Sequence, residues 1–329
     1  MAAMGHAKYI GRIGALAVAL GIGAGVVAAA AVPCVASGKP SKPDTSSSTD
    51  TSSTTSTSTA APSAKPSGGS GGAVSISVNG VVRKDSPTTE AITTSGERSR
   101  AVARGDGSYA DATNCIQCTA TATDGGRATA TGGTNNQASA TGPGSTAYAG
   151  GGDNNTATVS GTHSGAFAEY GDNNTATVSG DNSSAFAGAV YGVGNGNNNT
   201  ATVTGNNSSA QAGNGNDNTV TVTGNNSQAN SAIGGDSNTA TVTGNNNSFA
   251  QAGGGDNNTA TVEGDGSLAS AFLGDNNTAT VRGDNSRAFA ELGDNNTATI
   301  DGNNSQASAT APLGCTAEAN GDNASDSCS

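Results

Sequence analysis

Four cysteines flank a repetitive stretch of this chain, and two of them are close enough to form a motif. Cys115 and Cys118 precede the repeats, whereas Cys315 and Cys328 follow them. A Cys-x-x-Cys pair suits redox chemistry or half of a zinc site, but the chain holds no second such pair to complete a site. Because the cysteines after the N-terminal segment are even in number, we predict disulfides that form locally at each end of the repeats.

No set of side chains at suitable spacing predicts catalysis. His163 is the only histidine outside the N-terminal segment, and it lies in a turn of a single repeat, where a solvated loop residue is the simpler interpretation. The carboxylates recur with the repeat, which indicates a structural role. We therefore expect a non-enzymatic protein with no catalytic residue, metal or cofactor.

Calcium is the metal that the recurrent Gly-Asp turns would suit, because carboxylate, amide and backbone oxygens bind hard cations. Calcium-binding solenoids of the RTX type use G-G-x-G-x-D-x-U-x. Here the order is G-D-N-N-T-A-T-V-x, and Asn197 and Asn216 stand where other copies have Asp. The sequence leaves calcium at these turns open, and we assign no metal ligand.

These residues belong to one repeated unit, G-[DN]-x-N-T-[AV]-T-[VI]-x-G-x-x-S-x-A-x-[AS]. Its copies lie 19 or 20 residues apart, except for one spacing of 25 at the insertion 188–195. The copies start at Gly152, Gly171, Gly196, Gly215, Gly235, Gly255, Gly274 and Gly293, and a weaker copy starts at Gly133. A fixed period of this size is typical of a solenoid whose units pack only against their neighbours.

Each unit contains two short alternating runs, and each run follows a Gly/Asx turn, which predicts two β-strands per coil. One face of each run stays small in every copy, and the opposite face of the second run accepts Gln, Phe, Leu and Arg. The small face must point inward. It consists, in the first copy, of Asn155, Ala157, Val159, Ser164, Ala166 and Ala168.

Two columns of identical residues follow from this stacking. One is an asparagine ladder in the core, as in stacked cross-β structures: Asn155, Asn174, Asn199, Asn218, Asn238, Asn258, Asn277 and Asn296. The other is an outward ladder of Thr-x-Thr pairs: Thr156, Thr158, Thr175, Thr177, Thr200, Thr202, Thr219, Thr221, Thr239, Thr241, Thr259, Thr261, Thr278, Thr280, Thr297 and Thr299. We consider the threonines a candidate surface-binding site.

Composition supports a solenoid and excludes an ordinary globular core. The chain has 50 glycines, no tryptophan, five tyrosines, five phenylalanines and 12% charged residues. Its net charge of −12 argues against a nucleic-acid partner, since binding a polyanion requires clustered Lys and Arg.

The N-terminal segment, residues 1–72, has the pattern of an exported protein. Residues 1–36 combine basic residues, an apolar run at 13–32 and small residues at Cys34 and Ala36, as in a cleavable signal peptide. Uncleaved, the run would be a membrane anchor. Residues 37–72 are a Ser/Thr/Pro/Gly-rich linker expected to be disordered. The run KYIGRIGALAVALGIGAG and the following Ser/Thr-rich tract resemble mycobacterial exported proteins, which implies a secreted, cell-envelope or cell-surface protein.

The rest divides into a β-rich N-terminal cap and first atypical coils at 73–132, repeats at 133–311, and a Cys-containing cap at 312–329. In the first segment, Asn79-Gly80 within AVSISVNGVV predicts a β-hairpin. The expected fold is all-β, a β-solenoid of about nine two-strand coils.

The repeat resembles two groups of proteins. G-x-x-N-x-A-x-V with a Ser-led second strand is similar to curlin repeats of bacterial surface fibres, although Gly161, Gly180 and Gly205 stand where curlins have Gln. The Thr-x-Thr pairs resemble those of ice-binding β-solenoids. Our leading expectation is a structural or adhesive surface rod whose partners are itself, envelope components or a host surface. The alternatives are a curlin-like self-assembling fibre subunit and a protein that binds ice or polysaccharide.

Overall fold

A computed structural model describes residues 72–94, 97–189, 196–231 and 234–329. The predicted signal segment and nearly all of the predicted linker lie outside these residues, and so does most of the insertion at 188–195. The described residues belong to one compact unit, Ser63–Ser329.

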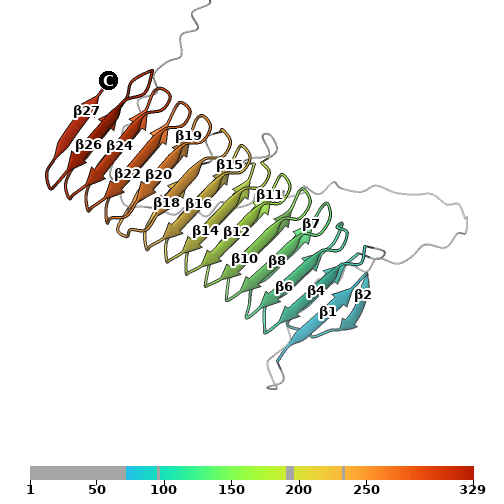
Figure 1. Ribbon diagram of the computed structural model, residues 1–329. Helices are drawn as coiled ribbons and strands as arrows, with labels where there is room; N and C mark the ends of the chain where they lie inside the picture. The colour runs from blue at the N-terminus through green and yellow to red at the C-terminus, as the bar shows by residue number, and fades with distance from the viewer. Residues whose placement is uncertain (1–71, 95–96, 190–195, 232–233) are drawn as a thin grey trace, which may run out of the picture. The chain divides into compact units, whose positions relative to one another are not determined.

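This unit is a β-solenoid, which confirms the predicted fold class, and every described strand belongs to one of two sheets (Figure 1). Sheet 1 has 14 strands in the order β2 (Val81–Lys84), β1 (Val74–Val78), β4 (Arg100–Arg104), β6 (Thr119–Thr123), β8 (Gln137–Thr141), β10 (Thr156–Ser160), β12 (Thr175–Ser179), β14 (Thr200–Thr204), β16 (Thr219–Thr223), β18 (Thr239–Val242), β20 (Thr259–Val262), β22 (Thr278–Arg282), β24 (Thr297–Asp301) and β26 (Thr316–Asn320).

Sheet 2 has 13 strands, and each of its later strands follows a strand of sheet 1 in the chain. Its order along the solenoid is β3 (Glu90–Thr93), β5 (Tyr109–Ala112), β7 (Arg127–Thr131), β9 (Thr146–Gly150), β11 (Gly165–Glu169), β13 (Ser184–Gly188), β15 (Ser209–Gly213), β17 (Gln228–Asn230), β19 (Phe249–Gly253), β21 (Leu268–Phe272), β23 (Arg287–Glu291), β25 (Gln306–Ala309) and β27 (Ser325–Cys328). From β4 onward, one strand of each sheet and the two turns between them form one coil.

The structure has about 12 coils, more than the nine that the repeat pattern predicts. The additional coils come from segments whose sequence departs from the repeat but whose strands keep the register of the solenoid and, except in β27, the small inward residues. Strands β4 to β7 supply them at the N-terminal end, and β26 with β27 forms the last one.

Neighbouring coils pair in parallel with equivalent residues opposite each other. Thr156 lies beside Thr175, Ala157 beside Ala176, and Val159 beside Val178. The inward residues are almost completely buried: Ala157 is 0% and Val159 1% exposed. Burial of apolar surface stabilises a fold by about 25 cal/mol per Å². Because an alanine side chain buries little such surface, hydrogen bonds between coils must contribute much of the stability.

The asparagine column, Asn136 and the eight asparagines of the predicted ladder, links the coils through the backbone. The backbone N–H of Asn174 donates to Asn155 Oδ1 at 2.9 Å, and Asn155 Nδ2 donates to the Gly171 carbonyl at 2.8 Å. In the predicted amide ladder, each Oδ1 therefore accepts a backbone N–H of the next coil rather than bonding the next amide, and most Nδ2 groups donate to a backbone carbonyl, with Asn174, Asn238 and Asn277 as exceptions. All members are 0% exposed.

A serine column repeats this arrangement at the second turn of each coil. The backbone N–H of Ser183 donates to Ser164 Oγ at 3.1 Å, and Ser164 Oγ donates to the Gly180 carbonyl at 2.6 Å. Asparagine at the first turn and serine at the second thus both accept a backbone N–H of the next coil and donate to a backbone carbonyl. The resulting satisfaction of buried backbone groups explains why both residue types are found in the core.

Glycine at the first position of both turns permits this close stacking. A Cβ added to Gly180 would lie 2.0 Å from the carbonyl oxygen of Gly205, and one added to Gly152 would lie 2.0 Å from that of Gly171. No side chain fits at that separation. Gly161, Gly180 and Gly205 are therefore required by the packing of one turn on the next.

The ends of the solenoid differ from its middle. β1 and β2 form the predicted hairpin, and β1 pairs antiparallel with β4. Both predicted disulfides are confirmed: Cys115–Cys118 spans one turn near the N-terminal end, and Cys315–Cys328 joins the two strands of the last coil. Within the described ranges, the structure contains no helix with the length and hydropathy needed to cross a membrane.

Candidate surface-binding face

The Thr-x-Thr pairs form two parallel files on the outside of sheet 1. We call this surface the threonine face and define it by the sixteen threonines of the predicted ladder. The parallel register places Thr200 beside Thr219, and Thr202 beside Thr221, and the same pairing continues from β10 to β24. These threonines are half-buried or exposed, whereas the residues between them are buried.

The files extend further than the sequence indicated. Thr119 and Thr121 of β6 and Thr316 of β26 occupy the same positions, while Gln137, Ser139 and Glu318 interrupt them. These threonines were missed because their coils lack the G-[DN]-x-N-T signature. The strand alternation alone could have revealed them.

The threonine face is regular and uncharged over much of its length. Residues two apart on a strand are ~6.7 Å apart, and neighbouring strands are ~4.7 Å apart. The outward positions of β6 to β18 hold only Thr, Ser and Gln. Within the described coils, no hydroxyl of the sixteen threonines has a hydrogen-bond partner in the protein, so each remains available to a ligand or water.

The charged side chains of the described strands of sheet 1 lie only towards its two ends. Glu263 and Arg282 form an ion pair at 3.2 Å beside the last strands, and both side chains are about half exposed. Arg100 and Arg104 flank the first coil. The threonine face is thus a hydroxyl and methyl lattice with charged margins.

The carboxylates of the turns are used within the structure. Asp172 Oδ1 accepts the backbone N–H of Asp153 at 2.8 Å, and Asn197 Oδ1 accepts that of Asp172 at 2.8 Å. Since only Oδ1 is needed, Asp and Asn are interchangeable at this position. In the described part of the chain, no three His, Cys, Asp or Glu side chains are grouped as a metal site would require.

The outer face of sheet 2 is irregular and carries most of the described aromatic residues. Tyr148, Phe167 and Phe186 stack on successive coils. Beside them, burial raises the pKa of Glu169 above its ordinary value. The pKa of Tyr148 is also raised, first by burial and then by the nearby Glu169 carboxylate. This face offers no repeated chemical pattern comparable to that of sheet 1.

Nearer the N-terminal end, Tyr109 interacts with two charged side chains. Its hydroxyl donates to Asp111 Oδ2 at 3.1 Å, and the Arg127 guanidinium carbon lies 4.6 Å from the centre of its ring. Burial, assisted by the Asp111 carboxylate, raises the pKa of Tyr109 to about 12. Tyrosine therefore stays neutral at any physiological pH and serves as a hydrogen-bond donor.

Three bulky residues adopt a left-handed backbone at the turn after sheet 2. Tyr170, Leu273 and Leu292 have φ of 58°, 59° and 62°, and they are 44%, 46% and 59% exposed. Gly151 and Gly254 fill the equivalent place in other coils with φ of 71° and 72°. Bulky residues in this conformation are strained, and the glycines that other copies have at this position are the sequence signal that indicates it.

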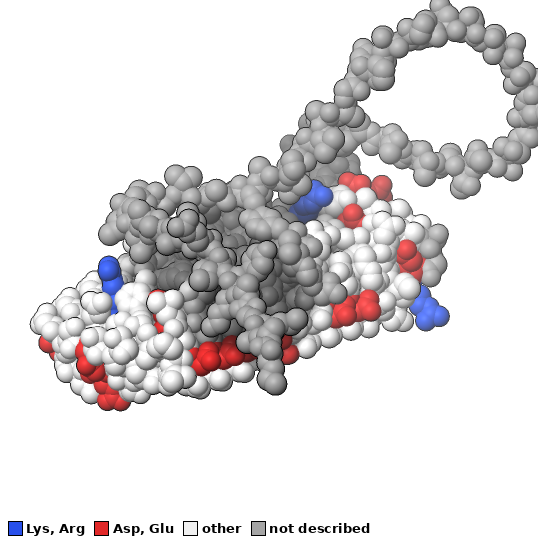
Figure 2. Space-filling view, turned by 90° about the horizontal axis from the view of Figure 1, so that it is seen from above, with Lys and Arg blue, Asp and Glu red and all other residues white. Residues whose placement is uncertain are grey.

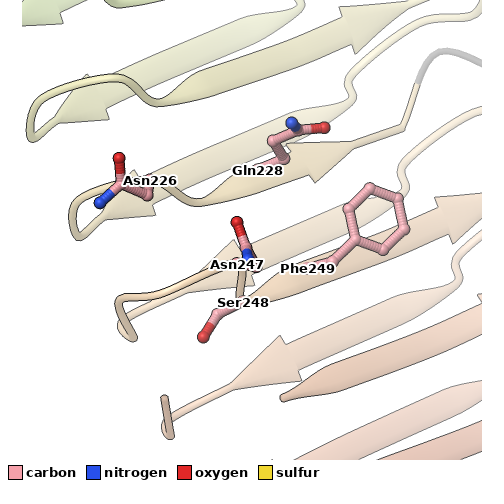
Figure 3. A pocket seen from close by; sticks show the side chains of 5 residues that line it. All are labelled: Asn226, Gln228, Asn247, Ser248 and Phe249. Carbon is pink, nitrogen blue, oxygen red and sulfur yellow. The ribbon is translucent and has the colours of Figure 1, made fainter. Parts of the chain in front are cut away.

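A shallow hollow on the sheet 2 side is lined by Asn226, Gln228, Asn247, Ser248 and Phe249 (Figure 3). Gln228 and Phe249 are neighbours on adjacent strands, and Figure 3 shows both side chains on the same side of the ribbon. Ser248 Oγ is already bonded to the Gly264 carbonyl at 2.7 Å. The hollow thus combines amides and one ring, with no acid or base among its lining residues.

The structure does not bring the remaining chemically reactive residues together. His163 is exposed in a turn with φ of 52°, beside Gly144 of the preceding coil. The two disulfides lie at opposite ends of the repeats. Figure 2 shows acidic side chains in groups and few basic ones on the described part of one side of the solenoid. No family model, curated protein or solved structure matches this chain.

Proposed function

We propose that this chain is an exported, non-enzymatic rod that adheres through its threonine face to an ordered surface rich in hydroxyl groups or water. One observation carries the proposal: two in-register files of threonine on one sheet, with hydroxyls that have no hydrogen-bond partner within the described coils. Crystalline polysaccharide and ice both present a regular array of hydroxyl groups or water molecules, which such a lattice can match. The export signal and linker predicted from the sequence favour a secreted or cell-surface location.

The regularity of the face supports binding to a repeating surface rather than to a single small molecule. A lattice of hydroxyls and methyls at ~4.7 by ~6.7 Å presents many identical weak contacts at once. Because the rod holds these contacts in place, they raise the overall affinity for the surface although each single contact stays weak. The high β-strand propensity of threonine could by itself account for its place on an exposed strand. The test must therefore separate a loss of binding from a loss of folding.

Adsorption of the full chain to ice and to microcrystalline cellulose and chitin tests the proposal. The variant Thr200→Lys/Thr219→Lys/Thr239→Lys/Thr259→Lys places four charges on the threonine face. The matched control, Ser209→Lys/Gln228→Lys/Phe249→Lys/Leu268→Lys, places four on the outer face of sheet 2 in the same coils.

We expect the wild type and the control to bind one of these surfaces and the threonine variant to lose binding, with all three giving the same far-UV circular dichroism. Binding to ice alone or polysaccharide alone would identify the surface. Failure of the wild type on all surfaces, or equal binding by both variants, would refute the proposal.

A curlin-like fibre subunit is the second candidate. It is favoured by the two-strand coil and by the in-register stacking of identical residues, as in cross-β assemblies. Light scattering of the purified chain tests this function, and a mass that stays monomeric with no thioflavin response would exclude it.

A further inference from the structure

The last coil departs from the repeat at the positions that link one coil to the next. Its strands keep the register of the solenoid, so each departure can be matched to its counterpart in the coil before. Cys315 replaces Asn296, Ala324 replaces Ser305, Asp326 replaces Ala307, and Cys328 replaces Ala309. All four substitutions lie on the inward side of the coil.

Two of these changes end the hydrogen-bonded columns. At an internal junction, such as the one between Asn155 and Asn174, four side-chain hydrogen bonds join the coils: two from the asparagine column and two from the serine column. Asn296 Oδ1 and Ser305 Oγ still accept N–H groups of the last coil, at 3.1 and 3.0 Å. Cys315 and Ala324 offer no such acceptor or donor to a further coil.

The third change places a charge on the inward side of the terminal strand. Asp326 Oδ2 accepts the backbone N–H of Glu318 in β26 at 2.8 Å, and its Oδ1 accepts that of Ser327 at 2.9 Å. An N–H at the edge of sheet 1 is thereby satisfied within the coil. Inward-pointing charge is a known means of keeping sheet edges from pairing with another chain.

At the opposite end of sheet 1, no described strand pairs with the outer edge of β2. β2 is its first strand, and all four of its residues are exposed, with Val81 at 49% and Val82 at 59%. β2 is antiparallel to β1, which is antiparallel to β4, so β2 runs in the same direction as β26. A second copy placed head to tail would continue sheet 1 as a parallel pair.

The charges of the two ends are complementary. β2 ends in Arg83 and Lys84, and the carboxylate of the following Asp85 is bonded to Ser75 Oγ and to the Ser86 N–H. The last coil and its approach, residues 301–329, carry Asp301, Glu318, Asp322 and Asp326 and no Lys or Arg. Attraction would therefore steer β2 of one copy to β26 of another.

We propose that residues 312–329 are a stop segment that prevents a second copy of this chain from adding through its β2 to the end of sheet 1. Direction, charge and exposure make β2 fit the sheet edge, and the stop segment withholds the hydrogen bonds that a further coil needs. Heterologous head-to-tail contacts that do not close into a ring grow into filaments. Restoring the repeat in the last coil should consequently produce filaments.

The test restores the repeat in the full chain with Cys315→Asn/Ala324→Ser/Asp326→Ala/Cys328→Ala. Light scattering and sedimentation measure mass, and electron microscopy detects filaments. We expect a monomeric wild type and a restored variant whose mass at least doubles and rises with concentration. Adding Arg83→Glu/Lys84→Glu to the restored variant should return it to the monomer.

Two further variants keep the result decisive. Cys315→Ala/Cys328→Ala removes the disulfide without restoring the columns and should stay monomeric. Ala324→Ser/Asp326→Ala retains the disulfide and should assemble even if the fourfold variant fails to fold. A polymeric wild type, a folded monomer for both restoring variants, or equal assembly of the disulfide-free control would overturn the proposal.

Discussion

Replacing Asn258 by alanine measures what one member of the asparagine column contributes. Asn258 Oδ1 accepts the backbone N–H of Asn277 at 2.9 Å, and its Nδ2 donates to the Gly274 carbonyl at 2.8 Å. Asn258→Ala removes both bonds and leaves two backbone groups in the interior without these partners. Each orphaned buried group costs about 1–3 kcal/mol, so we expect a loss of about 3 kcal/mol in the free energy of unfolding.

Asn277→Ala is the matched control within the same column. Asn277 Oδ1 accepts the N–H of Asn296 at 2.9 Å, but its Nδ2 is buried without a hydrogen-bond partner. Both variants lose the same side-chain volume at equivalent core positions. Because only one bond is lost here, Asn277→Ala should cost about half as much as Asn258→Ala.

Urea unfolding followed by far-UV circular dichroism measures both losses. Long repeat arrays can unfold in parts, so the comparison requires the same dependence on urea in all three proteins. Hydrogen exchange of the amides in β18 to β22 would then localise the weakened junction. Equal losses for the two variants, or a larger loss for Asn277→Ala, would refute the role assigned to the Nδ2 bond.

Three further substitutions test the packing, the backbone strain and the buried charge. Gly224→Ala should abolish cooperative folding, since an added Cβ would lie 2.0 Å from the Gly244 carbonyl oxygen. The control is Gly72→Ala, whose Cβ meets nothing within 4 Å. Equal thermal melting curves for the two variants would contradict the prediction. Leu292→Asn should stabilise by about 1 kcal/mol in urea unfolding because it relieves a left-handed leucine, and Leu313→Asn, at 94% exposed, should be neutral. Burial raises the folded pKa of Glu169 above 4.5, so the stability that its protonated form gives is present at low pH and lost as pH rises through the folded pKa. The stability of Glu169→Gln relative to the wild type should therefore increase over that rise in pH, and a constant difference from acid to neutral pH would be inconsistent with a raised pKa of this half-buried carboxyl.

The fold follows from the sequence because two strict patterns coincide. Alternation around Ala157 and Val159 assigns the inward face, and the recurrence of Gly-Asx turns sets the period. Both express local geometry that holds in every coil. The coils at 98–132 and 315–328 were harder to recognise, since cysteines and other residues replace the turn signature there while the alternation continues.

The candidate site was predictable in its main part and not in its extent. Thr156 and Thr158 are outward by alternation, so their files follow once the coils stack. Sequence could not reveal that the asparagine and serine side chains bond backbone groups, because this depends on the separation of turns in adjacent coils. The left-handed leucines were not predicted, although the glycine that the preceding coil has in the place of Leu273 is a signal of that conformation.

The contact surface itself can be observed when the rod is bound to its partner surface. Solid-state NMR transfer of magnetisation from isotopically labelled polysaccharide, or from ice protons, reports which side chains lie against that surface. We predict transfer to the methyl groups of Thr200, Thr219 and Thr239 and none to the rings of Phe167 and Phe289. Transfer to the phenylalanine rings without the threonine methyls would contradict the assignment of the threonine face.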